Sequence, residues 1–327
     1  MNARRVWALL ALLALTACGG SGVSGGSVSG SGNTNAVPQL QSVAPVVPQL
    51  QSVAPVVPQL EGVTRSVRQL EAVTRSVPQL QSVARLARHR TATMIFDDEF
   101  SGTQLDPTKW NTCYWWAYDN TCTNGGSLEQ EYYTPNNISV HDGYLDLVAE
   151  KQYVDPTHFY TSGMVSTNDC CGQPITFQFQ YGYMEMSAKL PPGKGMWPAF
   201  WLVPANHTWP PEIDAMEWQG QKPRTNFLTI HWGTSQDPQA SGGTFVGPNM
   251  SKAFHTYGLD WEPEAVTWYE DGKAIRTYSD ATNIPNLPMI VIVNLAIGGW
   301  LGYPNKHTVF PAHMLVDYVR VWDSYPY

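Results

Sequence analysis

Three acidic side chains lie within six positions of one segment, which reads WPPEIDAMEWQG from Trp209. In an extended strand alternate side chains share a face, so Glu212 and Asp214 point the same way. Glu217 is at odd spacing from both and would point to the opposite face. A one-residue bulge at Ala215 or Met216 would return Glu217 to the shared face, and bulges re-aim side chains at active sites.

Three carboxyls on one side of a strand favour glycoside hydrolysis. Like charges held close together raise some of their pKa values. The reaction needs one ionised carboxylate and one carboxyl that stays protonated near neutral pH. The alternative is a solvated acidic face, and spacing does not decide, because five residues of strand span ~16 Å while a retaining glycosidase holds its carboxyls ~5.5 Å apart.

Short strands must position these carboxyls. From about Thr93, runs rich in Val, Ile, Phe, Tyr and Trp alternate with Gly, Pro, Asn and Asp, and no long helical pattern appears. Period-2 patterns between turn signals predict strands and hairpins, and EDGK from Glu270 is a tight-turn signal. The sequence therefore predicts one all-β sandwich or barrel over residues 92–327.

The chain begins with features of export. Arg4 and Arg5 precede a short apolar run, so residues 1–18 predict a signal peptide rather than a membrane span, which needs ~20 apolar residues. The end of this segment, LTAC, resembles a bacterial lipobox and predicts lipidation of Cys18. Because no Asp follows, we expect an outer-membrane lipoprotein, with ordinary cleavage and secretion as the alternative.

Two spacer-like segments follow the leader. Residues 19–36 are rich in Gly and Ser and predict a flexible linker. Residues 37–86 repeat with a ten-residue period, as in VPQLQSVAPV, and the prolines of the first half forbid a continuous helix there. We interpret the repeats as a spacer, although the Pro-poor part has a near-heptad stripe that could form a short amphipathic helix or self-associate.

Composition excludes one class of partner and suggests another. Only 14% of residues are charged and the net charge is -8, so no basic patch supports nucleic-acid binding. Of 13 Trp residues, all but Trp7 fall at Trp110 or later. Many aromatics with few charges suggest a sugar-stacking surface, whereas the plainer interpretation places most of them in the core.

Residues 93–327 resemble glycoside hydrolase family 16, the laminarinase and lichenase family, through a series of blocks in the family's order. The blocks are FDDEFSG from Phe96, LDPTKW from Leu105, YYTPNN from Tyr132, DGYL from Asp142, YGYME from Tyr181, GMWPAFWL from Gly195, EIDAME from Glu212, FHTYGLDW from Phe254, NLAIGG from Asn294 and VDYVRV from Val316. The resemblance implies a β-jelly roll: two curved antiparallel sheets with a concave substrate cleft.

The resemblance also implies catalytic roles. Glu212 would be the nucleophile that forms a glycosyl-enzyme, and Glu217 the general acid and then the base. Asp214 would hydrogen-bond to the nucleophile and help to set the protonation states. Splitting the displacement into two steps retains the anomeric configuration.

Further positions are expected to line the cleft: HWG from His231 resembles the family's cleft strand, and the tryptophans are expected there from their places in the chain. Aromatic and imidazole side chains are expected to bind the sugar chain at Trp197, Trp201, His231, Trp300 and Trp115.

A structural calcium ion, far from the cleft, is expected at Glu99, Gly143 and Asp317, where backbone carbonyls plus one carboxylate suit a hard cation. The alternative is that Asp317 caps a neighbouring backbone. No cofactor is expected for catalysis.

Four cysteines remain once Cys18 is assigned to the leader, and an even number in an exported chain permits disulfides. Of the three pairings we favour Cys113 with Cys122, which closes a short loop. Cys170 and Cys171 are then either bonded to each other or free. Their spacing is not that of a zinc site.

Departures from the family pattern bear on the substrate. Met164 stands where laminarinases often carry Arg, Ser127 or a gap replaces the usual Asn, and residues 168–174 form an insert. We expect a monomeric endo-acting hydrolase of β-1,3- or mixed β-1,3-1,4-glucan. The alternatives are a hydrolase or transglycosylase for bacterial exopolysaccharide, agar or carrageenan, and a non-catalytic glucan-binding lipoprotein.

Overall fold

The computed structural model describes residues 91–117, 122–124 and 128–327. The predicted signal peptide, linker and repeats lie outside the described residues, as do Cys18 and Ser127. Regular structure in the described part consists of strands and two short 3-10 helices, η2 (Pro135–Asn137) and η3 (Ala281–Asn283). None of the helices described is long and apolar enough to cross a membrane.

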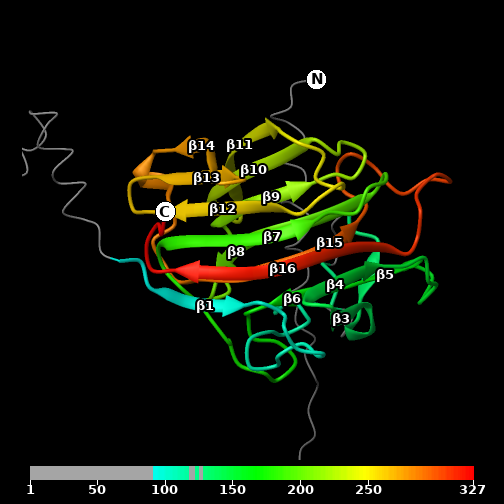
Figure 1. The fold of residues 1–327 in the computed structure, drawn as a ribbon. Helices are drawn as coiled ribbons and strands as arrows, with labels where there is room; N and C mark the ends of the chain where they lie inside the picture. The colour runs from blue at the N-terminus through cyan, green and yellow to red at the C-terminus, as the bar shows by residue number, and fades with distance from the viewer. Residues whose placement is uncertain (1–90, 118–121, 125–127) are drawn as a thin grey trace, which may run out of the picture. The chain divides into compact units, whose positions relative to one another are not determined.

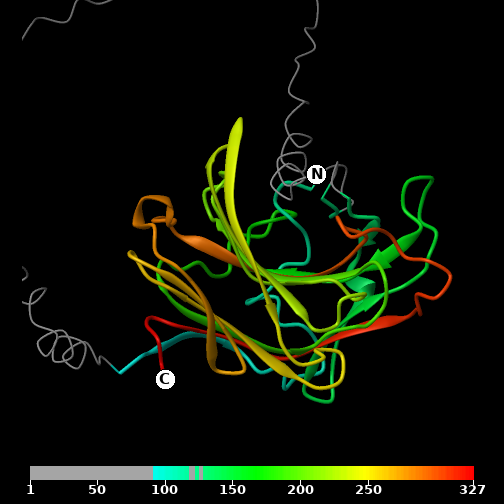
Figure 2. The same cartoon turned by 90° about the horizontal axis from the view of Figure 1, so that it is seen from above.

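Two antiparallel sheets form the body of the fold (Figure 1), and Figure 2 shows them as curved layers, one over the other. The eight-stranded sheet runs in the order β14 (Lys273–Tyr278), β13 (Val266–Glu270), β12 (His255–Trp261), β7 (Gly182–Lys189), β16 (Ala312–Trp322), β4 (Tyr144–Ala149) and β3 (Ile138–His141), with β1 (Met94–Asp98) pairing with β16.

The second sheet has six strands, in the order β11 (Asp237–Val246), β10 (Thr225–Thr234), β9 (Glu212–Trp218), β8 (Met196–Pro204), β15 (Met289–Ile297) and β6 (Met164–Ser166). A short parallel pair, β2 (Glu131–Tyr133) and β5 (Tyr160–Ser162), lies outside both sheets. The prediction of an all-β fold of two antiparallel sheets is confirmed.

The core lies between the two sheets because apolar residues alternate along their strands. On β8, Phe200 and Leu202 are fully buried in a cluster that also contains Met184 and Met186 of β7. Burying a side chain of this size stabilises the fold by ~1.5–3 kcal/mol. The other face of β8 carries Trp197 and Trp201, which are only half-buried, so this face is left for a ligand.

The predicted tight turn after β13 is confirmed. Asp271 (φ 49°) and Gly272 (φ 72°) join β13 to β14. Positive φ at both central residues is the geometry that matches the twist of a two-residue hairpin, and Asp-Gly adopts it readily.

Candidate active site

The predicted bulge lies in β9, at Ala215. Strand β8 pairs Ala199 with Glu217 and Trp201 with Asp214. The two β8 residues are two positions apart, whereas their partners on β9 are three positions apart, so β9 contains one extra residue. Ala199 and Trp201 are two apart and share a face, and directly opposed residues also share a face. Asp214 and Glu217 therefore lie on one face, which we call the carboxyl face: the side of the six-stranded sheet that bears Glu212, Asp214 and Glu217.

The opposite face of β9 anchors the strand in the core. Ile213 and Met216 are fully buried between the sheets. Beside the bulge, Trp268 of β13 donates its indole N–H to the backbone carbonyl of Asp214 at 2.7 Å. A buried carbonyl without such a donor costs ~1–3 kcal/mol, so this bond from the other sheet stabilises the bulged conformation.

Two ring nitrogens lie against Glu212. The Trp209 indole donates to Glu212 Oε2 at 2.9 Å. His231 is opposite Glu212 on β10, and its Nε2 lies 3.3 Å from Glu212 Oε1 and 3.3 Å from Asp214 Oδ2. Glu212 keeps 16% of its side-chain surface exposed against 4% for Asp214, so Glu212 is the one of the two that can reach a bound sugar.

Glu217 has a separate aromatic environment. The Trp197 indole donates to Glu217 Oε1 at 3.1 Å. Trp300 packs edge-on against Trp197, with 4.9 Å between ring centroids, and against Phe227, which is opposite Glu217 on β10. Trp197 therefore orients the carboxyl of Glu217 as well as presenting a ring to the carboxyl face.

Burial raises the pKa of all three carboxyls, and their surroundings separate them. The pKa of Glu212 rises to about 7, through burial and the charge of Asp214, against which His231 and the Trp209 indole act. Burial raises the pKa of Asp214 to about 8, although its hydrogen bond with Glu212 lowers it. Burial raises the pKa of Glu217 well above its usual range, and the charges of Asp214 and Glu212 raise it further. Near neutral pH, Glu212 is thus the carboxyl that ionises while Glu217 keeps its proton.

Replacing Trp209 with phenylalanine should move the acidic limb of the kcat/KM profile to higher pH. The variant keeps the ring but loses the donor that favours the ionised form of Glu212, so the pKa of Glu212 rises and less of it is ionised at acidic pH. A hydrogen bond to a charged group contributes ~1.5 kcal/mol, and kcat/KM below the limb should therefore fall about tenfold. The measurement is kcat/KM against pH, with Trp232→Phe as the control. A limb that stays in place in Trp209→Phe would contradict this assignment.

The remaining predicted sugar-binding residues lie at the Glu212 end of the carboxyl face or near it. Trp201 donates its indole N–H to Asn294 Oδ1 at 2.8 Å and packs edge-on against Tyr114 and Trp116. Trp115 stacks on His207 of the β8–β9 loop, with ring centroids 4.3 Å apart. The structure thus brings Trp197, Trp201, His231 and Trp300 to the carboxyls or their flanks, and it brings Trp115 to the β8–β9 loop.

Sequence reasoning gave Trp209 no role, although it begins the segment that carries the carboxyls. Its position three residues before Glu212 was the one sequence feature that could have suggested a role. The contact itself depends on the conformation of the β8–β9 loop, which directs the Trp209 ring back to Glu212. The same holds for Phe227, whose place opposite Glu217 follows only from the pairing of β9 with β10.

The predicted disulfide between Cys113 and Cys122 is confirmed, with 4.6 Å between their Cα atoms. Cys170 and Cys171 are free, which decides between the two alternatives left open for them.

Known proteins resemble this chain in sequence and in fold. The model of glycosyl hydrolases family 16 matches residues 126–320. An endo-1,3-1,4-beta-glycanase, EglC, of Rhizobium meliloti is 37% identical over 247 residues, covering 70% of this chain and 51% of the relative. A glucan endo-1,3-beta-glucosidase A1 of Niallia circulans is 37% identical over 263 residues, covering 70% and 37%. The chain therefore spans about half or less of these two relatives.

Among solved structures, the laminarinase catalytic domain of Thermotoga maritima superimposes with a TM-score of 0.64 at 32% identity. The match covers 72% of this chain and 100% of that domain. The shared part is thus the two-sheet fold that carries the carboxyl face.

Proposed function

The chain belongs to glycosyl hydrolase family 16, and we propose that it is a retaining endo-β-glucanase acting on β-1,3- or mixed β-1,3-1,4-glucan. One observation carries the proposal: the bulge at Ala215 places three carboxyls on one face, with separate donors on Glu212 and Glu217. The printed activities of the relatives from Rhizobium meliloti and Niallia circulans support the substrate class.

In the first step Glu212 attacks the anomeric carbon, and the glycosidic C–O bond breaks as Glu217 protonates the leaving oxygen. The Trp209 indole and His231 hold Glu212 and favour its ionised form. Asp214 lies beside Glu212, and because burial raises its pKa to about 8 it adds less negative charge there than an exposed carboxylate would.

In the second step Glu217, now ionised, takes a proton from water, which attacks the glycosyl-enzyme and releases Glu212. Each step inverts the anomeric carbon, so the product retains the starting configuration. Trp197 stays hydrogen-bonded to Glu217 and keeps the carboxyl in the same place for both proton transfers.

The test is to incubate the purified protein with laminarin, barley β-glucan, agarose and carrageenan, beside Glu212→Gln, and to chromatograph the products. Oligosaccharides from a glucan that are absent with the variant support the proposal, and NMR of the first product gives its anomeric configuration. Release from agarose or carrageenan alone would replace the substrate class. No release from any of the four would leave a binding role or an exopolysaccharide substrate. Incubation with a purified oligosaccharide of the cleaved glucan tests transglycosylation, which would give products longer than that oligosaccharide.

We also propose that the protein is exported as a monomeric outer-membrane lipoprotein through Cys18, with residues 19–86 as a spacer. The support is the pattern of the first 18 residues. Mass spectrometry of the N-terminal peptide from membranes tests this, because an unmodified Cys18 would overturn the anchor.

The pairing of three strands supports the proposed calcium site. Strand β16 pairs with β1 up to Asp98↔Val319 and with β4 from Leu145↔Val316, so Asp317 lies where β1 ends and β4 begins. Both carboxylate oxygens of Glu99 accept from Arg320, at 2.6 and 2.7 Å, so Glu99 would offer its backbone carbonyl rather than its side chain. With the Gly143 carbonyl and the Asp317 carboxylate, this donor set fits a hard cation.

Calcium at about 1 mM, the range in which extracellular modules bind it, should raise Tm by about 5 °C. For a site with a Kd of ~0.1 mM this is ten times Kd, which stabilises the folded state by ~1.4 kcal/mol, and ~1 kcal/mol shifts Tm by ~2–4 °C in a domain of this size. Thermal unfolding with calcium or with EDTA measures this. Asp317→Asn should abolish the shift, whereas the same shift in that variant would rule out Asp317 as a ligand.

A further inference from the structure

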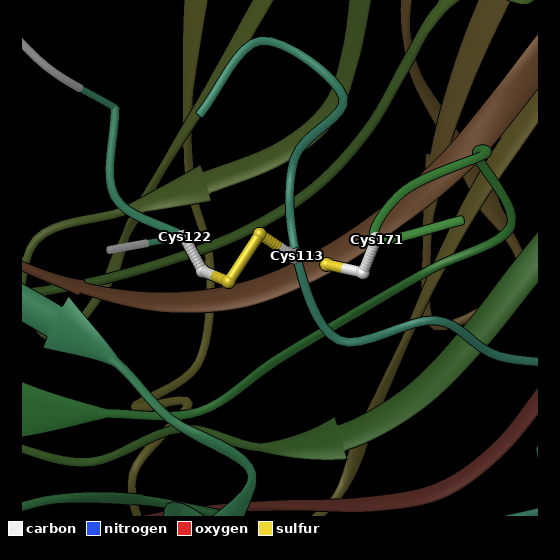
Figure 3. Close-up of side chains that lie close together, drawn as sticks. All are labelled: Cys113, Cys122 and Cys171. Carbon is white, nitrogen blue, oxygen red and sulfur yellow. A yellow bond between two sulfur atoms is a disulfide. The ribbon is translucent and has the colours of Figure 1, made fainter. Parts of the chain in front are cut away.

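Three cysteine sulfurs gather beside the loop that carries Trp115 and Trp116. Cys113 and Cys122 form the disulfide that closes this loop, and Cys171 belongs to the insert 168–174. The three sulfur atoms lie within 4.8 Å of one another. Figure 3 shows Cys171 on the Cys113 side of the disulfide, with its sulfur directed toward Cys113. A free thiol thus lies next to a disulfide contributed by a distant segment of the chain.

The surroundings of the four cysteines assign different chemical roles to them. Cys113 is buried, Cys122 is half-buried and Cys171 is exposed. Thiol–disulfide exchange requires a thiolate that can reach a disulfide sulfur, and Cys171 has both solvent access and proximity. Cys170 is less suited, because burial and its hydrogen bond with Cys171 raise its pKa to about 12, so that it stays protonated.

We propose that Cys171 is a thiol–disulfide exchange site that isomerises the Cys113–Cys122 disulfide. The Cys171 thiolate attacks the sulfur of Cys113, a Cys113–Cys171 bond forms, and the Cys113–Cys122 bond breaks. Cys122 leaves as a thiolate and takes up the proton that Cys171 gave to solvent. One disulfide replaces another, so the step needs no external oxidant or reductant.

We use the term aromatic wall for five side chains: Tyr114, Trp115, Trp116, Trp201 and His207. The exchange would change the covalent link that positions this aromatic wall. The Cys113–Cys122 bond closes the loop that contributes three of these side chains. The insert already contacts the wall, because Asp169 Oδ1 lies 2.6 Å from His207 Nε2. A Cys113–Cys171 bond would open the loop at Cys122 and tie the wall to the insert.

A consequence follows for activity, and this part rests on the proposed function. Trp201, which belongs to the aromatic wall, pairs directly with Asp214 on β9. A displacement of the aromatic wall would therefore alter the surface next to the carboxyls. We expect the isomer with Cys113 bonded to Cys171 to show a changed KM for long glucans and little change in kcat on short ones, since Glu212 and Glu217 are held by other residues.

The exchange itself is tested without any glucan. The full chain is incubated without reductant at about pH 4 or about pH 8.5, near the pKa of a free thiol. Free thiols are then alkylated in acid, and the disulfide-linked peptides are identified by mass spectrometry. At the acidic pH we expect Cys113–Cys122, with label on Cys170 and Cys171. At the alkaline pH a fraction should carry Cys113–Cys171, with label on Cys122.

Three variants test the proposal. Cys171→Ser should retain Cys113–Cys122 alone at both pH values, and the matched control Cys170→Ser should still exchange. Cys122→Ser, treated with oxidised glutathione and checked for its fold by circular dichroism, should form Cys113–Cys171. The proposal is overturned by Cys113–Cys122 as the sole pairing in the wild type at the alkaline pH, by a Cys170–Cys171 bond, or by exchange that depends on Cys170 instead.

Discussion

Replacing Glu212 with glutamine is expected to lower kcat on β-glucan by at least about 10⁴-fold while substrate binding persists. Loss of a nucleophile in a covalent hydrolase costs this much or more, because the remaining groups have no covalent intermediate to act on. Glutamine keeps the shape and can still accept from the Trp209 indole, which lies 2.9 Å from Oε2. The fold should therefore survive, and the loss should appear in kcat rather than in Tm.

Initial rates on laminarin, with Tm measured in parallel, check this expectation. Glu264→Gln, at an exposed position outside the carboxyl face, is the matched control and should keep full activity. A sharper readout uses Glu212→Ala with azide and an aryl β-glucan oligosaccharide. Azide should then attack the substrate once and yield the α-glycosyl azide. A Glu212 variant that retains activity within about tenfold of the wild type would exclude this residue as the nucleophile.

Replacing Glu217 with glutamine should reduce the rate on polymeric glucan by about 10²–10⁴-fold, the usual contribution of a general acid–base catalyst. The size of the loss should depend on the leaving group. The phenolate of a phenol with a low pKa departs without protonation. An aryl glycoside should therefore still form the glycosyl-enzyme at close to the wild-type rate. Burial raises the pKa of Glu217 well above its usual range, which is what keeps the proton available for the polymer.

Burst kinetics with the aryl glycoside distinguish this outcome from simple damage to the site. Glu217→Gln should release the phenol in a burst and then turn over slowly, since the second step lacks its base. In Glu217→Ala, azide should intercept the intermediate and give the β-glycosyl azide, the opposite anomer from that of the Glu212 variant. Equal losses on both substrates, with no burst, would show that Glu217 does not supply the proton.

Several features of the molecule could be read from neighbouring residues alone. Alternation and turn residues indicated an all-β domain, and Asp271-Gly272 indicated a hairpin, because strand faces and positive φ values are local properties. A bulge at Ala215 or Met216 followed from parity, because Glu217 can share a face with Asp214 only if one residue is added between them, and the strand pairing puts it at Ala215. The Cys113–Cys122 pairing was likewise suggested by a short separation along the chain.

Only the tertiary structure determines which donor binds each polar group of the active site. No spacing rule places the Trp209 ring against Glu212, the Trp197 ring against Glu217, or the Trp268 indole on the Asp214 carbonyl from the other sheet. The sulfur of Cys171 reaches Cys113 across 58 positions of sequence for the same reason. Sequence determined which residue types could do the chemistry and which face of a strand they occupy. Their protonation states and reactivity depend on burial and on donors from distant strands, so only the packed fold determines them.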